Sequence, residues 1–326
     1  MERFKVLDGW RGISIICVLL GHLFPLGPKI LRLNEAIAAT GMVLFFILSG
    51  FLITNIIIKD SDPINFLIKR ITRIIPLAWM TLIITLWLTK ASGHEWLSSM
   101  LFYANLPPFG LKDITSHFWS LCVEVQFYFL TAIFLFFLKE KAFYVFPFLA
   151  IFITGNRIFH QETISIVTQF RMDEILAGCM LAIVYNFGKK TKFYISKINP
   201  LVVFPLVILS AHPLSGPINY LRPYLAMILI GSTLLAIKKT KINGVLESGF
   251  LFYMASISYA LYVFHGIFSS TWLGSGDKME KYLKRPLLLG VTFALSHLST
   301  NYYEKWWIET GRKIIKSRKL KKQQMV

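Results

Sequence analysis

The amino-acid sequence predicts an all-α, polytopic membrane protein with about ten transmembrane helices. The chain has 326 residues, of which 55% are hydrophobic and 15% aromatic. Its mean hydropathy of +0.58 is too high for a soluble domain. The apolar residues come in repeated long runs, and the run over residues 36–58 holds no charge and is long enough to cross a bilayer as a helix.

The apolar runs define the expected elements along the chain. Several runs have uncharged cores shorter than about 20 residues, so some helices should be tilted or broken. Residues 1–309 are expected to form one transmembrane domain and residues 310–326 a basic tail. The predicted spans are 10–28, 37–58, 74–90, 118–138, 142–156, 172–187, 199–213, 223–237, 250–273 and 286–308.

The distribution of Lys and Arg predicts that both termini are cytoplasmic. With both ends inside, 22 of these residues lie in internal segments and 11 in external loops, as the positive-inside rule requires. The net charge of +18 is therefore interpreted as loop charge that sets topology, with no role in binding nucleic acid. We expect the basic tail to rest on anionic lipid headgroups.

The sequence shows no pattern for a metal or a permanently bound cofactor. Cys17, Cys122 and Cys179 each fall inside a predicted span, without metal-ligand spacing or a disulfide framework. A Gly-rich phosphate loop, HExxH and GxSxG are all absent. This argues against an ATP-driven pump, a zinc protease and a serine hydrolase.

The first span carries two ionisable residues, Arg11 and His22. Ionisable groups inside a membrane are costly and usually mark a functional site or a buried polar network. Their spacing of eleven residues places both side chains on one helix face, roughly 16 Å apart along the axis. We expect Arg11 at the membrane surface and His22 well inside, where it would be a titratable base.

The segment before the third span holds Lys69, Arg70 and Arg73. The two arginines are spaced i, i+3 and should project together on a helix as a fork suited to phosphate oxygens. The alternative is ordinary positive-inside loop charge.

A polar stripe enters the fourth span. Ser120, Glu124 and Tyr128 follow one another at i, i+4 on one helix face. A carboxylate there needs a cationic partner or must be protonated. The alternative is a structural ion pair that fixes helix packing.

Polar residues also open the sixth span and line the last two. Arg171 precedes the sixth span and can pair locally with Glu174; like Ser120 and Tyr128, it is also a candidate to line a cavity. The later stripes are expected to face a cavity or another helix, with ordinary interhelical hydrogen bonding as the alternative. Their members are Tyr262 and His265 in the ninth span, and His297, Asn301 and Glu304 in the tenth.

Taken in order, these segments resemble the acyltransferase-3 family of membrane acyltransferases. The resemblance covers nearly the whole chain. It consists of LDGWRG with His22 eleven residues after Arg11, then FFILSGFLI, KRITRIIPLAW, HFWSLCVEVQFY, RMDEILAGCMLA, ISYALYVFH and YYEKWW.

The resemblance implies about ten transmembrane helices, a cytoplasmic acyl-CoA donor and transfer of an acyl group, usually acetyl. By motif position, Arg11 and His22 match the family's essential pair, and Arg70 and Arg73 match its donor-associated RxxR motif. Glu124 matches a family carboxylate, but a second glutamate of that pattern is replaced by valine at position 125. Many members carry a C-terminal hydrolase-like domain, and this chain is expected to be a form without one.

These inferences together predict an acetyl-CoA-dependent O-acetyltransferase of the bacterial inner membrane. Its acceptor would be a hydroxyl of a cell-surface or exported glycan, such as lipopolysaccharide O-antigen. We expect His22 to act as the base or as a transient acyl carrier, with Arg11 and Glu124 assisting. The partners would be membrane lipids, acyl-CoA and the glycan. The alternative is a transporter or flippase that uses the same polar stripes as a pathway. The sequence does not decide the oligomeric state.

Overall fold

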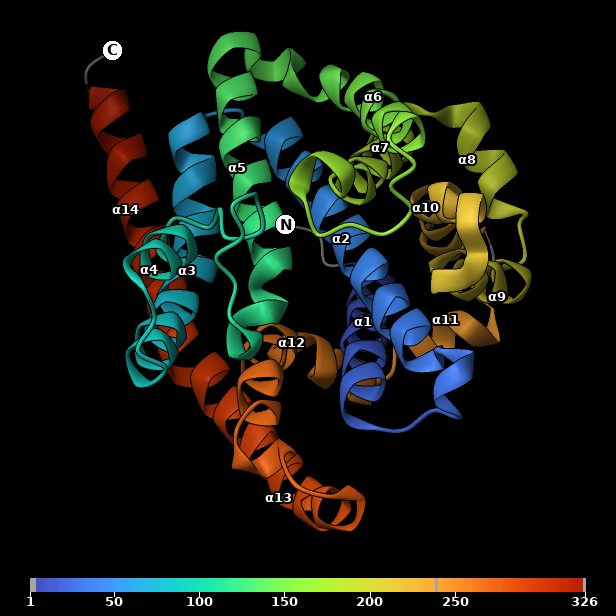
Figure 1. The fold of residues 1–326 in the computed structure, drawn as a ribbon. Helices are drawn as coiled ribbons and strands as arrows, with labels where there is room; N and C mark the ends of the chain where they lie inside the picture. Colours follow the sequence, from blue (N-terminus) through green and yellow to red (C-terminus); the bar gives the residue numbers. More distant parts are fainter. Residues whose placement is uncertain (1–3, 238–239, 325–326) are drawn as a thin grey trace. The chain divides into compact units, whose positions relative to one another are not determined.

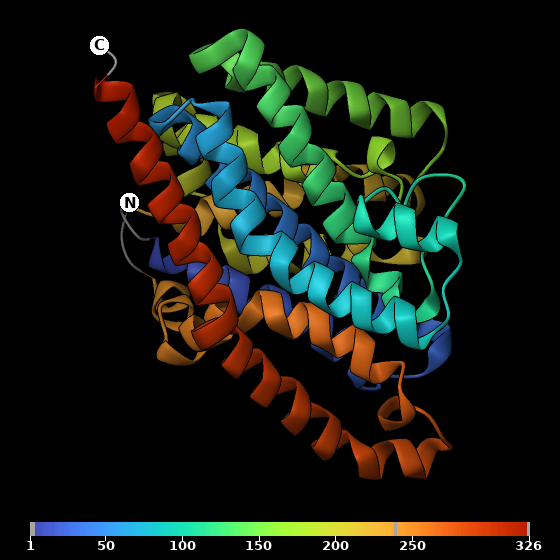
Figure 2. The same cartoon turned by 90° about the vertical axis from the view of Figure 1, so that its left-hand side faces the viewer.

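The computed structural model describes residues 4–237 and 240–324, and within these ranges it is built of helices without a strand (Figures 1 and 2). The all-α prediction is therefore confirmed. Every predicted span has a helical counterpart among the described residues. In chain order these are α1 Lys5–Leu23, α2 Leu33–Lys59, α3 Pro63–Leu88, α5 Trp119–Leu138, α6 Val145–Phe159, α7 Asp173–Phe187, α9 Pro200–Ala211, α10 Arg222–Leu234, α12 Gly249–Ser269 and α13 Lys278–Leu298.

The remaining helices are mostly short. They are α4 Gly93–Met100, α8 Lys189–Ser196, α11 Lys241–Leu246 and the longer α14 Lys305–Gln324. A π-helical segment, Ser299–Glu304, joins α13 to α14. The predicted tail at residues 310–326 thus begins inside a helix.

Five helical segments in the described ranges are long and apolar enough to cross a membrane, or six if one bent pair counts as a span. In that test α5 and α6 fall within one segment, Asp113–Phe159. Helices α7 and α10 have only 15 and 13 residues, against the ~20 that a perpendicular span needs. The count of ten spans and the cytoplasmic termini remain predictions. Three residues used in the topology count, at positions 3, 238 and 239, lie outside the described ranges.

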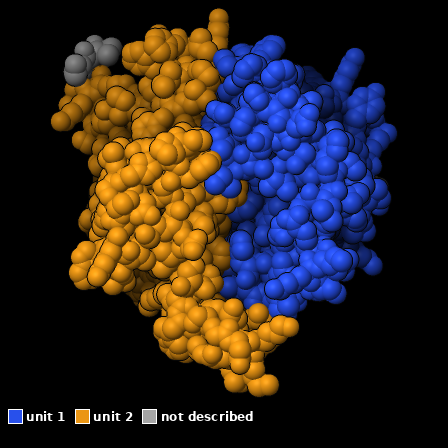
Figure 3. Space-filling view, viewed as in Figure 1, with its two compact units in different colours: residues 1–55, 143–258 blue, residues 56–142, 259–326 orange. Residues whose placement is uncertain are grey.

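Figure 3 colours two compact units. Unit 1 comprises residues 1–55 and 143–258, and unit 2 comprises residues 56–142 and 259–326. The boundaries fall within α2 and α12, so both helices contribute to each unit. Each unit is described by itself below.

The core of unit 1 forms around α1, α2, α7 and α10. Helices α2 and α7 cross at two glycines. A Cβ on Gly50 would lie 1.9 Å from the Ile175 carbonyl oxygen, and one on Gly178 would lie 2.0 Å from the Ile47 carbonyl oxygen. Only glycine permits this backbone contact, which is how membrane helices commonly approach.

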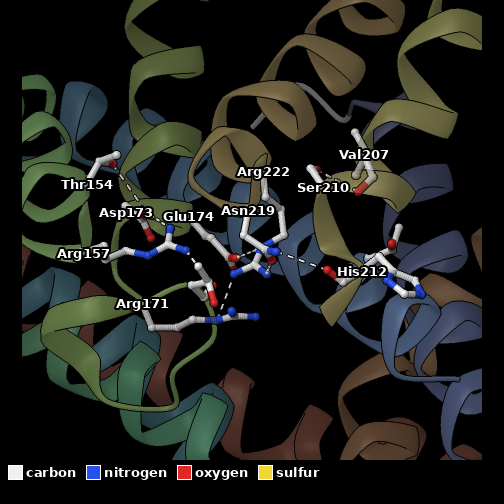
Figure 4. Close-up of polar contacts among 12 residues, drawn as sticks. Thr154, Arg157, Arg171, Asp173, Glu174, Val207, Ser210, His212, Asn219 and Arg222 are labelled. Atoms are coloured by element: carbon white, nitrogen blue, oxygen red, sulfur yellow. Dashed lines mark hydrogen bonds and ion pairs between the residues drawn. The ribbon is translucent and has the colours of Figure 1, made fainter. Parts of the chain in front are cut away.

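A buried charge cluster joins α6, α7 and α10 in unit 1 (Figure 4). Arg157 pairs with Asp173 at 2.5 Å, and Arg222 pairs with Glu174 at 2.7 Å. Arg171 lies 3.4 Å from the second oxygen of Glu174, as the local i, i+3 spacing predicted. All five side chains are at most 4% exposed.

The cluster also holds the connection between α6 and α7. Besides its ion pair, Arg157 donates hydrogen bonds to the carbonyl oxygens of Glu162 and Thr163, at 3.3 and 3.0 Å. Its guanidinium thus has acceptors on all sides, which satisfies the requirement for burying a charge.

In unit 2, α3 packs against α5 and against α14 (Figure 2). The far end of α14 is tied to the loop before α3 by ion pairs from Lys319 to Asp60 at 3.1 Å and from Lys322 to Asp62 at 2.6 Å. Lys69 also pairs with Asp60, at 3.2 Å. Part of the basic tail therefore binds carboxylates of the protein itself, whereas the sequence suggested lipid headgroups.

These pairs perturb both aspartates. Burial raises the pKa of Asp60, but hydrogen bonds from Lys319 and Lys69 outweigh it and hold the pKa below its ordinary value. Burial also raises the pKa of Asp62, but hydrogen bonds from Lys322 and from the Asn65 backbone amide outweigh it. The pKa of Asp62 therefore lies below its ordinary value.

Arg157→Ala should strongly destabilise unit 1, because it leaves the buried carboxylate of Asp173 without its cation. The expected loss is about 3–5 kcal/mol. Thermal unfolding in detergent would measure it. The exposed pair of Arg32 and Glu35 supplies the control, since Arg32→Ala should leave the melting temperature unchanged. Equal melting temperatures for both variants would contradict a supporting role for the cluster.

The end of α14 should detach from the α2–α3 loop in acid. Because the folded pKa values of Asp60 and Asp62 are depressed, the ion pairs contribute fully above the unfolded value of about 3.9 and are lost as pH falls through the folded values. Trypsin cleavage within residues 318–322 at neutral pH reports the state of the tail. Asp60→Asn with Asp62→Asn should expose it at pH 7, and continued protection in that variant would refute the tether.

Candidate functional site

Helix α1 carries Arg11 and His22, both in unit 1. Arg11 is half-buried, whereas His22 is exposed and lies in the last turn of the helix. His22 therefore lies near the end of the helix, and its depth in the membrane stays a prediction. The expected span of 10–28 was displaced, since α1 starts at Lys5 and ends at Leu23, just before Phe24 and Pro25 turn the chain. Proline disfavours a helical residue before it, so the helix stops there.

Asn34 fixes the end of α1 that carries His22. Its side-chain amide donates to the carbonyl oxygens of Gly21 and Phe24 at 2.8 and 2.5 Å, and its oxygen accepts from the Leu26 amide at 3.2 Å. These are helix-end groups that would otherwise lack partners. Sequence reasoning missed Asn34; its only signal was a polar amide at the start of an apolar helix.

On α3, the residues of the donor-associated motif lie in different environments. Arg70 is buried at 7% exposure, whereas Arg73 is exposed and Lys69 is half-buried in its pair with Asp60. The two arginines therefore do not form one exposed fork. Arg70 is the member of the motif that enters unit 2.

Arg70 meets the polar stripe of α5. Its guanidinium carbon lies 5.6 Å from the centre of the Tyr128 ring, and the Tyr128 hydroxyl donates to Glu124 at 2.6 Å. Glu124 is 3% exposed. The predicted interior carboxylate is thus confirmed as buried, with a phenol as hydrogen-bond donor.

One nitrogen of Arg70 is left over. Its Nε is buried and has no hydrogen-bond partner among the described residues. A gap of only about 10 Å³ borders Arg70 and is lined also by Val125 and Tyr128. Val125 is apolar and supplies no acceptor for Arg70. A buried guanidinium with an unused donor is primed to bind an acceptor oxygen.

A second polar cluster joins α5 to α12 in unit 2. Ser120 donates to the Tyr262 hydroxyl at 2.6 Å, and that hydroxyl donates to the carbonyl oxygen of His117. His265 Nδ1 lies 2.6 Å from the Tyr262 carbonyl oxygen. All four residues are buried, so the structure brings together three predicted residues and adds His117.

The two imidazoles of this cluster have defined tautomers. A carbonyl oxygen only accepts, so the proton lies on Nδ1 of His265 and on Nε2 of His117, which is 3.0 Å from the Val263 oxygen. In the neutral form of each ring, the lone pair lies on Nε2 of His265 and on Nδ1 of His117. The ring centres are 5.4 Å apart. The rings approach over Gly266, where a Cβ would lie 2.2 Å from His117 Nδ1.

The stripe on the last predicted span does not face inward as a whole. His297 and Asn301 are exposed, which corrects the prediction that they line a cavity. Only Glu304 is buried, and it accepts from the hydroxyls of Ser299 and Thr300 at 3.2 and 3.0 Å. The π-helical turn over Ser299–Glu304 changes the angle between successive residues, so a stripe drawn at 3.6 residues per turn does not persist.

The described residues contain no group of three or more His, Cys, Asp or Glu side chains close enough to hold a metal ion. Cys17, Cys122 and Cys179 are free and buried. They behave as small apolar residues in the helix packing.

Comparison with known proteins places these features in a family. A family described as an acyltransferase domain, acyltransferase-3, matches residues 4–308. A Staphylococcus aureus (strain COL) protein named "Putative O-acetyltransferase" is 24% identical over 318 residues, covering 81% of this chain and 50% of the relative. The peptidoglycan O-acetyltransferase of Listeria monocytogenes serovar 1/2a is 26% identical over 156 residues, covering 40% of this chain and 24% of the relative.

The chain thus spans about half the length of the Staphylococcus relative and less of the Listeria one. No solved structure is significantly similar to it. The family match extends over both units and includes every motif that carried the resemblance, from Arg11 to the segment at Glu304. The chain belongs to the acyltransferase-3 family of membrane acyltransferases.

Proposed function

We propose that this protein transfers an acetyl group from acetyl-CoA to a hydroxyl of a cell-surface or exported glycan, and that it works in a bacterial inner membrane. The observation that carries the proposal is Arg70, a buried guanidinium with an unused Nε next to the Glu124–Tyr128 pair. Ionisable groups are kept at such cost inside membrane helices mainly for function. The names of the relatives support O-acetyl transfer as the reaction.

The donor end of the reaction is proposed to lie at α3. Lys69, Arg70 and Arg73 put three cations on two turns of one helix. CoA carries several phosphate charges at one end and its thioester at the end of a long, thin arm. The exposed cations would attract the phosphates, and Arg70 would hold an oxygen of the arm or of the thioester.

The transfer itself needs a base. The acceptor hydroxyl oxygen attacks the thioester carbonyl carbon, a C–O bond forms, and the C–S bond breaks to release CoA. His22 would take the hydroxyl proton and return it to the departing thiolate. His22 lies in the last turn of α1, so a bulky glycan would approach it at a helix end. A transient acyl-imidazole on His22 is the covalent version of the same step.

The acceptor is proposed only as a class. The Listeria relative is named for peptidoglycan, and lipopolysaccharide O-antigen shares the required sugar hydroxyls. Purified protein in proteoliposomes, supplied with acetyl-labelled CoA and either glycan, tests the proposal. Label on the glycan supports it. Label that crosses the bilayer without joining a glycan would instead support a transporter.

His22→Ala should lower the rate of transfer by about 10²-fold or more, because it removes the proposed acceptor of the hydroxyl proton. The initial rate of glycan labelling measures this. His94, an exposed histidine on α4, supplies the matched control, because His94→Ala should keep the wild-type rate. Wild-type turnover by a folded His22→Ala protein would remove His22 from the mechanism.

Arg70 and Arg73 should differ when changed one at a time. Arg70→Lys keeps a charge but loses the planar fork in a desolvated site, so the KM for acetyl-CoA should rise about tenfold or more. Arg73→Ala removes a solvent-screened charge and should change KM by about fivefold at most. Steady-state kinetics in detergent checks both. A larger rise in KM for Arg73→Ala than for Arg70→Lys would show that Arg70 is structural.

A further inference from the structure

A groove of about 660 Å³ opens at one end of unit 2. One wall is the loop at residues 61–63, between α2 and α3, and the other is the last turn of α5 with the segment that follows, residues 135–141. The tail of α14 reaches the same loop through Lys322 and Asp62. The topology prediction assigns all three segments to the cytoplasm. Their meeting at one end of unit 2 is consistent with that prediction.

The wall formed by residues 135–141 combines aromatic rings with cations. Phe136 and Phe137 are 69% and 74% exposed, with ring centres 5.2 Å apart. Lys139 and Lys141 follow them and are exposed. No ion pair joins either lysine to another side chain in residues 4–237 and 240–324, whereas Lys69, Lys319 and Lys322 nearby are all paired.

The wall formed by residues 61–63 contains Asp62, whose negative charge is compensated by neighbouring cations. Asp62 receives Lys322 at 2.6 Å and has Arg318 at 3.8 Å, and its oxygen also caps α3 by accepting from the Asn65 amide. The carboxylate is thus already compensated. The unpaired lysines opposite leave the groove attractive to anions, although Glu140 between them offsets part of this charge.

Lys139 occupies a costly backbone position. It ends α5 with φ 50° and ψ −125°, a region that glycine adopts readily and a lysine does not. A lysine in this position is strained, and strained residues concentrate at functional sites. The position also makes a clean experiment possible, because Lys139→Gly removes the amino group and relieves the backbone.

The groove and the gap at Arg70 lie along the same helix. Pro63 borders the groove and Arg70 borders the gap, seven residues or roughly 10 Å further along α3. A ligand with a charged aromatic head and a long thin arm could place its head in the groove, against the lysines and phenylalanines. Its arm would extend from there along α3 toward Arg70.

We propose that this groove binds the nucleotide end of the acyl donor, a 3′-phosphorylated adenosine diphosphate. Phe136 and Phe137 contact the adenine, and Lys139 and Lys141 contact the phosphates. This assignment rests on the proposed function and adds a substrate subsite to it. The volume lies within the 300–1,000 Å³ usual for small-molecule sites.

The test compares donors with and without the nucleotide. Lys139→Gly with Lys141→Ala should raise the KM for acetyl-CoA about tenfold or more and leave the KM for acetyl-pantetheine unchanged. Acetyl-3′-dephospho-CoA should show a smaller rise than acetyl-CoA if a lysine contacts the 3′-phosphate. Lys189→Ala with Lys190→Ala, which removes two exposed lysines from α8 in unit 1, is the matched control and should alter neither KM.

Any one of three outcomes would overturn the subsite. An unchanged KM for acetyl-CoA overturns the subsite, and so does an equal rise for acetyl-pantetheine, which would indicate general damage. A rise seen only in phosphatidylglycerol vesicles, and absent in phosphatidylcholine vesicles, would assign the groove to a lipid headgroup and also overturn it. The melting temperature of the variant checks folding.

Direct binding of unacylated CoA separates this inference from the proposed function. Titration calorimetry of the detergent-purified protein needs no turnover. If wild-type protein binds CoA and the double variant binds it at least tenfold more weakly, the subsite stands even where no glycan is labelled. Equal binding by both proteins refutes the subsite and leaves acetyl transfer to be judged by the labelling experiment.

Discussion

A guanidinium buried among apolar helices must find its acceptors inside the protein, and this constraint organises both units. In unit 1, Arg157 has a carboxylate and two backbone carbonyl groups. Its partners come from different segments, so the charge can be satisfied only when those segments are assembled. In unit 2, Arg70 has a tyrosine ring and a nearby carboxylate but keeps one unused donor.

Helix α3 carries several charged residues, from its N-cap at the surface to the buried Arg70. Its N-cap, Asp62, anchors the α14 tail, its second turn holds Lys69 on Asp60, and Arg70 follows inside. Exposure does not fall steadily along the helix, because Arg73, beyond the buried Arg70, is exposed again. In the proposed donor site a polyanion would be attracted by the exposed cations, where screening by water makes binding reversible, and its arm would meet the desolvated Arg70.

The exposure of His22 changes how its role is understood. In the proposed mechanism His22 is a base at a helix end, which a large acceptor could approach without opening of a helix bundle. Asn34 keeps that helix end in one conformation by satisfying its carbonyl groups. The buried pair of His117 and His265 is of a different kind, since its tautomers are set by backbone carbonyls and it is packed over Gly266.

The sequence by itself determined the fold class, the helical segments and the residues that carry charge into them, because apolar runs, helical spacing and the cost of buried charge act locally. It therefore predicted Glu124 inside α5 and the pairing of Arg171 with Glu174. Only the tertiary structure decided which faces are covered. It separated Arg70 from Arg73, exposed His22, His297 and Asn301, and joined His117 to His265. Burial depends on neighbours distant in sequence and, at residues 299–304, on a π-helical turn that no 3.6-residue pattern describes.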